Sequence, residues 1–345
     1  MTILHVLYSN RFSGAENVVC QIIEMFRGYP DVRMVYCSPD GQIREALEER
    51  GVEFAPLSEL SRAELSRVTS EVRPDIVHAH DMRASFTAAL ACKKTPFISH
   101  VHNNFVNARG LSPKSVAYLY AAKKAKHIFW VSESAMNDYA FRKSVAHKSE
   151  VLYNIISIDA LYKKMQKDTA EYSYDVAYVG RLTEQKNPQR LMAVAAKLRE
   201  LKSDVKIAVV GNGDLEEETK ALCREYGLEA NVDFLGYQSN PLKLLYSARA
   251  MVMVSRWEGT PMCALEAMAL GVPIVSTPID GLKVLIDDGE NGYLSDDDSE
   301  IAEKLFSIIS DASLRARMSE YTLKKAKEIN DVEAYRARLL EQYKN

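Results

Sequence analysis

The stretch Ser255-Arg-Trp-Glu-Gly-Thr-Pro-Met-Cys-Ala-Leu-Glu-Ala-Met-Ala-Leu-Gly271 runs from the end of an apolar strand into an apolar helix. The strand ends at about Ser255. The helix begins near Pro261, because Thr260 is a good N-cap and proline suits the first helical turn. The amides of residues 262–264 would have no partner within the helix. A helix start placed in this way is a ready site for an anion.

Two carboxylates in this stretch are candidates for binding a ligand. Glu266 is the one charged side chain of a helix expected from Met262 to Leu270, and burying a polar group without a partner costs roughly 2–7 kcal/mol on transfer scales. Hydroxyl groups of a sugar or ribose would satisfy it, and so would a structural ion pair with a lysine or arginine elsewhere. Glu258 lies in the preceding loop, where a charged residue is ordinary.

A second stretch, Tyr178-Val-Gly-Arg-Leu-Thr-Glu-Gln-Lys-Asn-Pro188, also joins a strand to a helix. Asn187 and Pro188 predict an N-cap and a first helical residue. Arg181 and Lys186 then lie in a loop at the carboxyl edge of the sheet, beside helix amides. Two cations in that place suit a diphosphate. The alternative is a pair of solvated loop charges.

Outward from these stretches, short apolar strands alternate with amphipathic helical patterns. The strands expected in the first half are Ile3–Tyr8, Arg33–Cys37, Ile76–Ala79, Phe97–Val101, Ile128–Val131 and Val151–Tyr153. Those expected in the second half are Val176–Val179, Lys206–Val210, Val232–Leu235, Met251–Val254 and Ile274–Ser276. Near-continuous apolar strands separated by helices predict parallel sheets covered on both faces.

The pattern is interrupted once, after Asn154. We therefore expect an α/β protein of two Rossmann-like, doubly wound domains: residues 1–155, a linker over 156–172, and residues 173–328. A last helix at 329–345 is expected to pack back on the first domain. Ligands of such sheets bind beyond the carboxyl ends of the strands, which in a tandem pair predicts the cleft between the domains.

The composition excludes several classes of protein. The 345 residues are 47% hydrophobic and 26% charged with a formal net charge of -3, as in a soluble globular chain and unlike a nucleic-acid-binding one. Five scattered cysteines without a CxxC spacing predict reduced thiols and a cytoplasmic location. The N-terminus has no signal-peptide pattern, and no segment is apolar enough to span a bilayer.

Further candidates come from glycines and histidines. Gly14 lies between the first strand and the first helix, where a ligand can approach the backbone closely. The stretch Gly211-Asn-Gly213 lacks the third glycine of the dinucleotide fingerprint, which argues against an NAD-dependent oxidoreductase. The pairs at 78/80 and 100/102 end two strands, each pair on one face, but without the cysteine or HExxH spacing of a zinc site. A zinc site is the alternative, but no metal site is predicted: structural histidines are the base expectation for His78 and His100, whereas His80 and His102 are expected nearer the cleft.

Taken together, the two stretches resemble the retaining glycosyltransferases of family four, which have the GT-B fold. The resemblance rests on Glu258 and Glu266 at an EX7E spacing and on Gly180-Arg-Leu-Thr-Glu-Gln-Lys186, and it covers essentially the full chain. It implies that Arg181 and Lys186 hold the donor diphosphate and stabilise the leaving group. Glu266 would bind the nucleotide ribose, Glu258 would lie near the donor sugar, and His102 would face the reacting sugar.

The resemblance also implies donor contacts from several glycine-rich turns. Gly14 matches the second glycine of the family's Gly-Gly loop, whose first glycine is replaced here by Ser13. The region of Gly236 and Tyr237 is where the family holds the base. The donor-binding residues expected in all are Gly14, Gly180, Gly211, Gly236, Tyr237, Gly259, Thr260, Pro261, Met262 and Glu266.

The function implied is a metal-independent, retaining hexosyltransferase without a cofactor. It would move a sugar from a UDP-sugar, with a GDP-sugar next in order, to a glycan or lipid-linked acceptor of a cell-surface polysaccharide, such as a capsule or lipopolysaccharide. A sugar-nucleotide epimerase and a catalytically silent nucleotide-sugar-binding scaffold are the alternatives. The basic region 114–148 would permit peripheral contact with an anionic membrane, against the alternative of a solvated helix.

Overall fold

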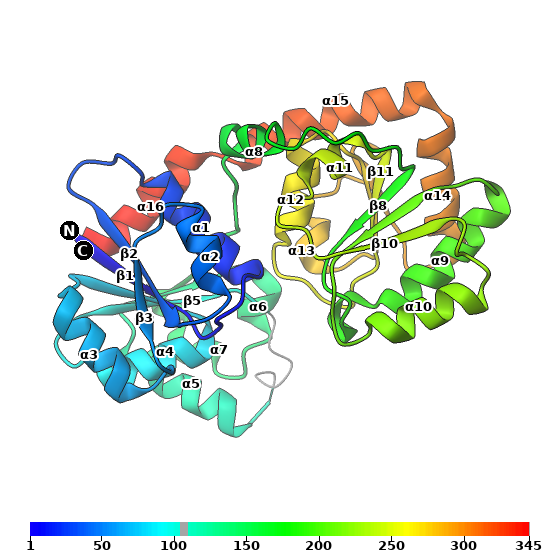
Figure 1. Ribbon diagram of the computed structural model, residues 1–345. Helices are drawn as coiled ribbons and strands as arrows, with labels where there is room; N and C mark the ends of the chain where they lie inside the picture. Colours follow the sequence, from blue (N-terminus) through cyan, green and yellow to red (C-terminus); the bar gives the residue numbers. More distant parts are fainter. Residues whose placement is uncertain (104–109, 345) are drawn as a thin grey trace. The chain divides into compact units, whose positions relative to one another are not determined.

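The computed structural model describes residues 1–103 and 110–344. The chain divides into two compact units. Unit 1 comprises Met1–Ile155 and Val332–Asn345, and unit 2 comprises Ile156–Asp331. Each unit is an α/β domain built on one parallel sheet, as the alternating pattern predicts (Figure 1).

Unit 1 has a parallel sheet whose described strands follow the order β3-β2-β1-β4-β5-β6-β7. Its strands are β1 (Thr2–Val6), β2 (Arg33–Pro39), β3 (Phe54–Leu57), β4 (Ile76–His80), β5 (Phe97–Val101), β6 (His127–Trp130) and β7 (Ser149–Val151). Its helices are α1 (Gly14–Met25), α2 (Ile43–Glu48), α3 (Arg62–Val72), α4 (Asp81–Ala91), α5 (Pro113–Lys124), α6 (Glu133–Asn137), α7 (Arg142–Val145) and α16 (Val332–Lys344).

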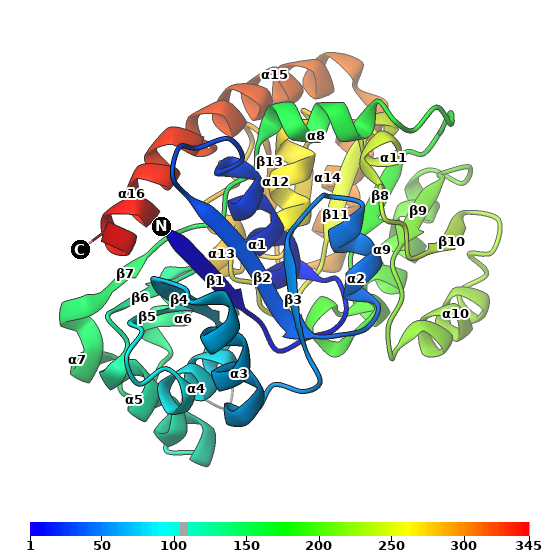
Figure 2. The ribbon, with the colours of Figure 1, turned by 60° about the vertical axis from the view of Figure 1, so that its left-hand side comes forward.

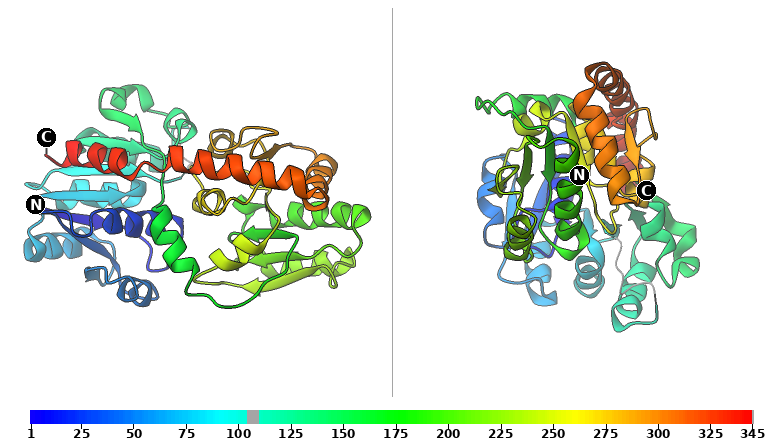
Figure 3. Two further views of the ribbon diagram at one scale, coloured as in Figure 1. Left: turned by 90° about the horizontal axis from the view of Figure 1, so that it is seen from above. Right: turned by 90° about the vertical axis from the view of Figure 1, so that its right-hand side faces the viewer.

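The two faces of this sheet carry different side chains. Leu4 and Val77 belong to an apolar core shared with residues of α3, α4 and α5, which lie together on one side of the sheet (Figure 2). Because side chains alternate along a strand, the neighbours of these residues point to the other face. There α16 lies beside α1 (Figure 3), and Arg336 Nε donates to the carbonyl oxygen of Met25 at 2.9 Å.

Unit 2 has a second parallel sheet, with its described strands in the order β10-β9-β8-β11-β12-β13. The strands are β8 (Val176–Val179), β9 (Ile207–Val210), β10 (Val232–Gly236), β11 (Ala250–Met253), β12 (Ile274–Ser276) and β13 (Gly292–Leu294). The helices are α8 (Ile158–Met165), α9 (Pro188–Leu201), α10 (Glu216–Glu225), α11 (Leu242–Ser247), α12 (Met262–Ala269), α13 (Asp280–Lys283), α14 (Asp298–Ser310) and α15 (Ala312–Ile329). Helices α9, α10 and α14 cover one face, and α11 and α12 lie on the other (Figure 1).

Several local predictions differ from the structure; strand β1, for example, ends at Val6 and not at Tyr8. Much of the stretch 156–172, expected to be a linker, forms helix α8, which Ser157 caps by accepting a hydrogen bond from the amide of Ala160. Strands β3 and β13 were not expected, because each is short and lies at the edge of its sheet. Strand β7 begins and ends two residues earlier than expected.

Candidate functional site

The loop after β8 brings two of the predicted cations to the carboxyl edge of the unit 2 sheet. The hydroxyl of Tyr178 donates to the carbonyl oxygen of Arg181 at 3.0 Å, which fixes the start of the loop. The side chain of Arg181 is exposed, with a nitrogen 3.4 Å from Oε1 of Gln185. Asn187 has a left-handed backbone (φ 55°) and precedes Pro188 at the start of α9, as predicted, but its side chain makes no capping bond.

The centre of the site is a buried ion pair between Lys186 and Glu258. Their Nζ and Oε1 atoms are 2.5 Å apart, and the side chains are only 12% and 7% exposed. The carboxylate has two further donors: Ser255 Oγ donates to Oε1 at 2.7 Å, and Gln185 Nε2 donates to Oε2 at 3.3 Å. Gln185 also donates to the carbonyl oxygen of Trp257 at 3.0 Å. The loop after β8 and the loop before α12 are therefore joined by several hydrogen bonds.

Burial alone would lower the pKa of Lys186, but the charge and hydrogen bond of Glu258 outweigh it and hold that pKa above its usual value. The amine is therefore a permanent cation. An ammonium has three N–H donors, and one of them is used by the carboxylate. Lys186 can thus bind an anion while it remains paired with Glu258.

Helix α12 begins at Met262, as expected, but its N-terminal cap differs from the prediction. Its N-cap is Pro261, not Thr260, and no side chain caps it. The amide of Ala264 donates to the carbonyl oxygen of Pro261 at 3.1 Å, so it is not among the free amides, contrary to the prediction. The geometry of a helix start leaves the amides of Met262 and Cys263 for an anion. Met262 and Thr260 themselves are buried.

Glu266 lies in the middle of α12 and is half-buried, so the full burial assumed from sequence was wrong. Cys263 is the other half-buried residue of this helix, three positions earlier and therefore on the same face. Burial raises the pKa of the Cys263 thiol to about 11, with Lys186 acting in the opposite direction. The thiol is neutral near pH 7 and is not a nucleophile there.

Three of the predicted glycines lie together where β8, β9 and β10 end. The amide of Gly180 donates to Val210 O at 2.9 Å, and that of Gly211 donates to Gly236 O at 2.8 Å. Gly211 has φ +135°, and a Cβ there would lie 2.0 Å from the carbonyl oxygen of Gly180. Only glycine permits this close approach. Tyr237, the next residue after Gly236, is 57% exposed.

Gly259 is also packed against another glycine. A Cβ on Gly281, in α13, would lie 1.5 Å from the carbonyl oxygen of Gly259 and 3.2 Å from that of Glu258. The loop that carries Glu258 therefore rests directly on the backbone of α13. Gly281 could not be identified as a site residue from the sequence, because the residues in contact are 22 positions apart.

In unit 1, Gly14 is the first residue of α1, and no atom of the described residues lies within 4 Å of the position a Cβ would take. Ser13, which replaces the first glycine of the expected pair, donates its hydroxyl to Oε2 of Glu16 at 2.5 Å. The serine thus closes the first turn of the helix through its side chain. The open space over Gly14 is compatible with a ligand.

His102 follows β5 in a group of five histidines on one sheet face. Its amide donates to Oδ1 of Asp81 at 2.8 Å, and its Nε2 lies 2.7 Å from Nδ1 of His80. Burial lowers the pKa of His102 to about 3 and raises that of Asp81 to about 7. The other members are His5, His78 and His100. Sequence reasoning found the two pairs but missed His5, because a single histidine in a strand carries no spacing signal.

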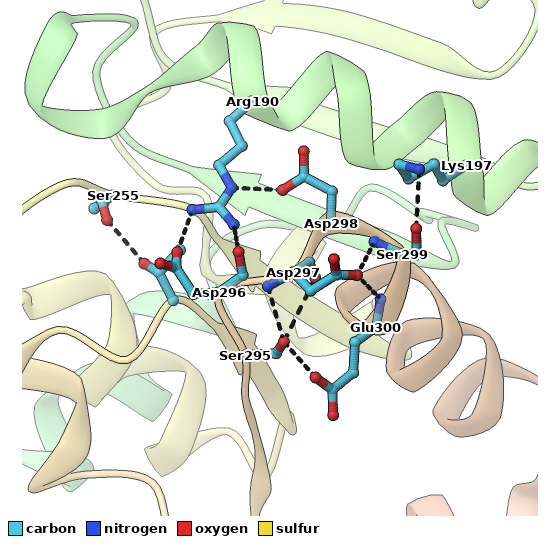
Figure 4. Close-up of polar contacts among 10 residues, drawn as sticks. Arg190, Lys197, Ser255, Ser295, Asp296, Asp297, Asp298, Ser299 and Glu300 are labelled. Atoms are coloured by element: carbon cyan, nitrogen blue, oxygen red, sulfur yellow. Dashed lines mark hydrogen bonds and ion pairs between the residues drawn. The ribbon is translucent and has the colours of Figure 1, made fainter.

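A separate depression in unit 2, about 490 Å³ in volume, is lined by residues of α9 and by the start of α14. Arg190 donates to Asp298 Oδ1 at 2.6 Å and to Asp296 Oδ1 at 2.7 Å, and Asp297 caps α14 (Figure 4). These groups satisfy one another and join the two helices. We assign the depression a structural role.

Comparisons with known proteins identify both units. Residues 163–325 match the family model of glycosyl transferases group 1, and residues 12–160 match that of glycosyltransferase family 4. An uncharacterised glycosyltransferase of Methanocaldococcus jannaschii is 30% identical over 232 residues, 61% of this chain and 57% of that protein.

The N-acetylgalactosamine-N,N'-diacetylbacillosaminyl-diphospho-undecaprenol 4-alpha-N-acetylgalactosaminyltransferase of Campylobacter jejuni is 29% identical over 246 residues, 70% of this chain and 66% of that enzyme. The alignments thus span less than two thirds of the length of these two curated relatives. The crystal structure of Anabaena HepE in complex with UDP-glucose superposes with a TM-score of 0.85 at 21% identity, covering 99% of this chain and 98% of that one. The two family models, the relatives and the shared fold show that this chain belongs to the GT-B glycosyltransferases of family 4.

Proposed function

We propose that this chain is a retaining glycosyltransferase that uses a UDP-sugar as donor, with a GDP-sugar as the second choice. The observation that carries the proposal is the Lys186–Glu258 pair, a buried permanent cation beside the first amides of α12 at the carboxyl edge of a parallel sheet. Such an edge is where open α/β sheets bind nucleotides.

In this mechanism unit 2 binds the donor. The remaining N–H groups of Lys186, the guanidinium of Arg181 and the first amides of α12 bind the diphosphate. When the glycosidic bond breaks, negative charge develops on the β-phosphate, and these donors stabilise it without rearrangement. Glu258 keeps Lys186 charged and in place, while Glu266 binds the ribose. Because two cations already meet the developing charge, we propose that transfer needs no metal ion.

The acceptor we propose is a glycan or a lipid-linked saccharide of a cell-surface polysaccharide or lipopolysaccharide. The Campylobacter jejuni relative is named as a transferase that acts on a diphospho-undecaprenol-linked saccharide. The Anabaena structure holds UDP-glucose, which supports the choice of a UDP-sugar donor. His102, in unit 1, would face the sugar that is transferred.

The direct test is a panel of UDP-, GDP-, ADP- and CMP-linked sugars measured by thermal shift and by release of the nucleotide. At about 100 times its Kd, the true donor should stabilise unit 2 by about 2.7 kcal/mol. The response should disappear in Lys186→Ala and in Glu266→Ala. Binding without nucleotide release, with or without acceptor, would favour the silent scaffold. Interconversion of free sugar nucleotides would favour the epimerase.

Replacing Gly14 by alanine should separate donor contact from folding. In the part of the chain that the structure describes, no atom lies within 4 Å of the added methyl group, so the free energy of unfolding should change by less than about 0.5 kcal/mol. If a ligand approaches this backbone, kcat/KM for the donor should fall by about tenfold or more. Gly110→Ala is the matched control, because its Cβ would also lie in open space. Equal kcat/KM in the two variants would remove Gly14 from the donor site.

We also propose that α5 and its neighbours contact an anionic membrane surface. Part of the basic region has a structural role instead, because three lysines donate to main-chain carbonyls. Lys126 donates to Gln342 O at 2.8 Å, Lys148 to Ala125 O at 2.6 Å, and Lys124 to Ala89 O at 3.4 Å. Besides Lys124, the exposed cations of this region are Lys114, Lys123, Arg142 and Lys143. None of the helices that the structure describes combines the length and hydropathy that crossing a bilayer requires.

Apolar side chains accompany these cations. Leu111 is 84% exposed and Val116 is 52% exposed, beside the half-exposed ring of Tyr120. Vesicles with anionic lipid should float the wild-type protein at low salt, and Val116→Asp should reduce the floated fraction severalfold. Tyr246→Asp, an equally exposed position in unit 2, should leave it unchanged. Absence of flotation with the wild type would end the membrane hypothesis.

A further inference from the structure

The buried face of the unit 1 sheet holds a polar cluster that the proposed transfer reaction does not need. His5 on β1 and His78 on β4 are register partners, and His80 lies two residues further along β4. All three are buried, with at most 1% of each residue exposed. Alternation along the strands turns them away from the apolar core, toward the face where α16 lies.

The hydrogen bonds within this cluster leave ring nitrogens unpaired. His5 Nδ1 and His80 Nε2 lie 3.0 Å apart, and Nδ1 of His78 lies 2.7 Å from the hydroxyl of Tyr343 in α16. Within the described residues, Nε2 of His78 and Nε2 of His5 have no hydrogen-bond partner and are shielded from solvent. A buried polar atom without a partner costs about 1–3 kcal/mol, so the unpaired Nε2 of His78, whose other ring nitrogen is already engaged by Tyr343, requires an explanation.

We infer that His5, His78 and His80 bind a divalent transition-metal ion of the Zn²⁺ type. Each offers a ring nitrogen, and these three nitrogens lie within 4.8 Å of one another. Around a tetrahedral Zn²⁺ with bonds near 2.1 Å, the nitrogens would be about 3.4 Å apart. The 3.0 Å separation of the His5 and His80 nitrogens therefore has to widen by only a few tenths of an ångström.

The chemistry of the donors selects the ion. Imidazole nitrogens suit Zn²⁺, Ni²⁺, Co²⁺ and Cu²⁺, whereas Mg²⁺ and Ca²⁺ require oxygen ligands. His78 also has the support typical of a metal-binding histidine. Tyr343 engages its Nδ1, which fixes the ring and leaves Nε2 for the metal.

A second trio, His80, His100 and His102, fits less well. His102 is partly exposed, and its Nε2 lies 2.7 Å from His80 Nδ1, a hydrogen-bond distance well below the edge of a zinc tetrahedron. The two arrangements are compatible if His80 binds the metal through Nε2. Its proton then stays on Nδ1 and donates to His102, which sets the tautomer of His102.

Metal analysis of the purified full chain tests this inference. After treatment with a chelator and desalting, the protein should retain one Zn²⁺ per chain on addition of Zn²⁺. Added Co²⁺ should give the visible absorption of a tetrahedral site. Saturating Zn²⁺ should raise the Tm of the unfolding transition of unit 1 by about 5 °C, and Mg²⁺ should not. These three readouts use the wild-type protein, so they do not depend on any variant folding.

Variants then locate the ion. His78→Gln should weaken Zn²⁺ binding at least tenfold, and His5→Asn repeats the test if His78→Gln does not fold. His100→Gln and the exposed control His147→Gln should bind Zn²⁺ as the wild type does. Absence of bound Zn²⁺ in the wild type would overturn the inference, as would unchanged binding in His78→Gln. Loss of binding in His100→Gln with retention in His78→Gln would move the ion to the second trio and overturn the assignment. Because no readout involves sugar transfer, failure here leaves the proposed function untouched.

Discussion

Replacing Lys186 by methionine should lower the free energy of unfolding of unit 2 by about 3–5 kcal/mol and kcat/KM for sugar transfer by about a thousandfold. The first effect follows because Glu258 would stay buried without its cation. The second follows because the diphosphate would lose the cation that stabilises it as it leaves. Chemical denaturation measures the stability, and hydrogen exchange in α9 and α12 assigns the loss to unit 2.

The double variant Lys186→Met/Glu258→Gln separates the two effects. Removing both charges leaves no unpaired buried ion, so most of the lost stability should return while activity stays low. Lys197→Met is the control for the loss of a lysine, because Lys197 Nζ donates to Ser299 Oγ on the exposed surface of the same unit. It should change stability by less than about 0.5 kcal/mol. A double variant no more stable than Lys186→Met would show that Glu258 is not the group left unpaired.

The parts of the fold that the sequence could predict are those with a local signal. The central strands are apolar runs, α9 begins at Pro188 and α12 directly follows Pro261, so these features can be recognised within a short window of sequence. The edge strands β3 and β13 have four and three residues, and β3 contains a proline. A segment of that length is too short to show the alternation of apolar and polar residues that is typical of a strand. Helix α8 was missed because its polar residues resemble those of a linker.

The same limit applies to the site. Sequence reasoning found Lys186 and Glu258 separately and gave one to the diphosphate and the other to the sugar. It did not predict that Lys186 and Glu258 form an ion pair, because no sequence pattern indicates a contact between residues 72 positions apart. Residue type and the position after a strand could predict which groups reach the sheet edge. Which of these groups contact one another depends on how the elements pack. The same holds for His5 and His78, which the pairing of β1 with β4 brings together.

Replacing Gly281 by alanine should be as damaging as removing a charge from the site, although Gly281 carries no functional group. The new Cβ would lie 1.5 Å from the carbonyl oxygen of Gly259 and 2.6 Å from its carbonyl carbon, and main-chain atoms cannot rotate aside as a flexible side chain can. Either α13 or the Glu258 loop must move. Overpacking of this kind costs about 3 kcal/mol or more.

This movement should also lower the activity, because the carbonyl oxygen of Glu258 lies only 3.2 Å from the same Cβ position. A shifted loop separates Glu258 from Lys186, so we expect kcat/KM to fall by about a hundredfold or more even at a temperature where the variant is folded. Denaturation and donor titration of Gly281→Ala measure the two effects, and Gly14→Ala supplies the stability expected when the methyl group meets no atom. If Gly281→Ala matched Gly14→Ala in stability and the wild type in activity, the loop could not rest on α13. The position of Glu258 would then have to come from Ser255 and Gln185 alone.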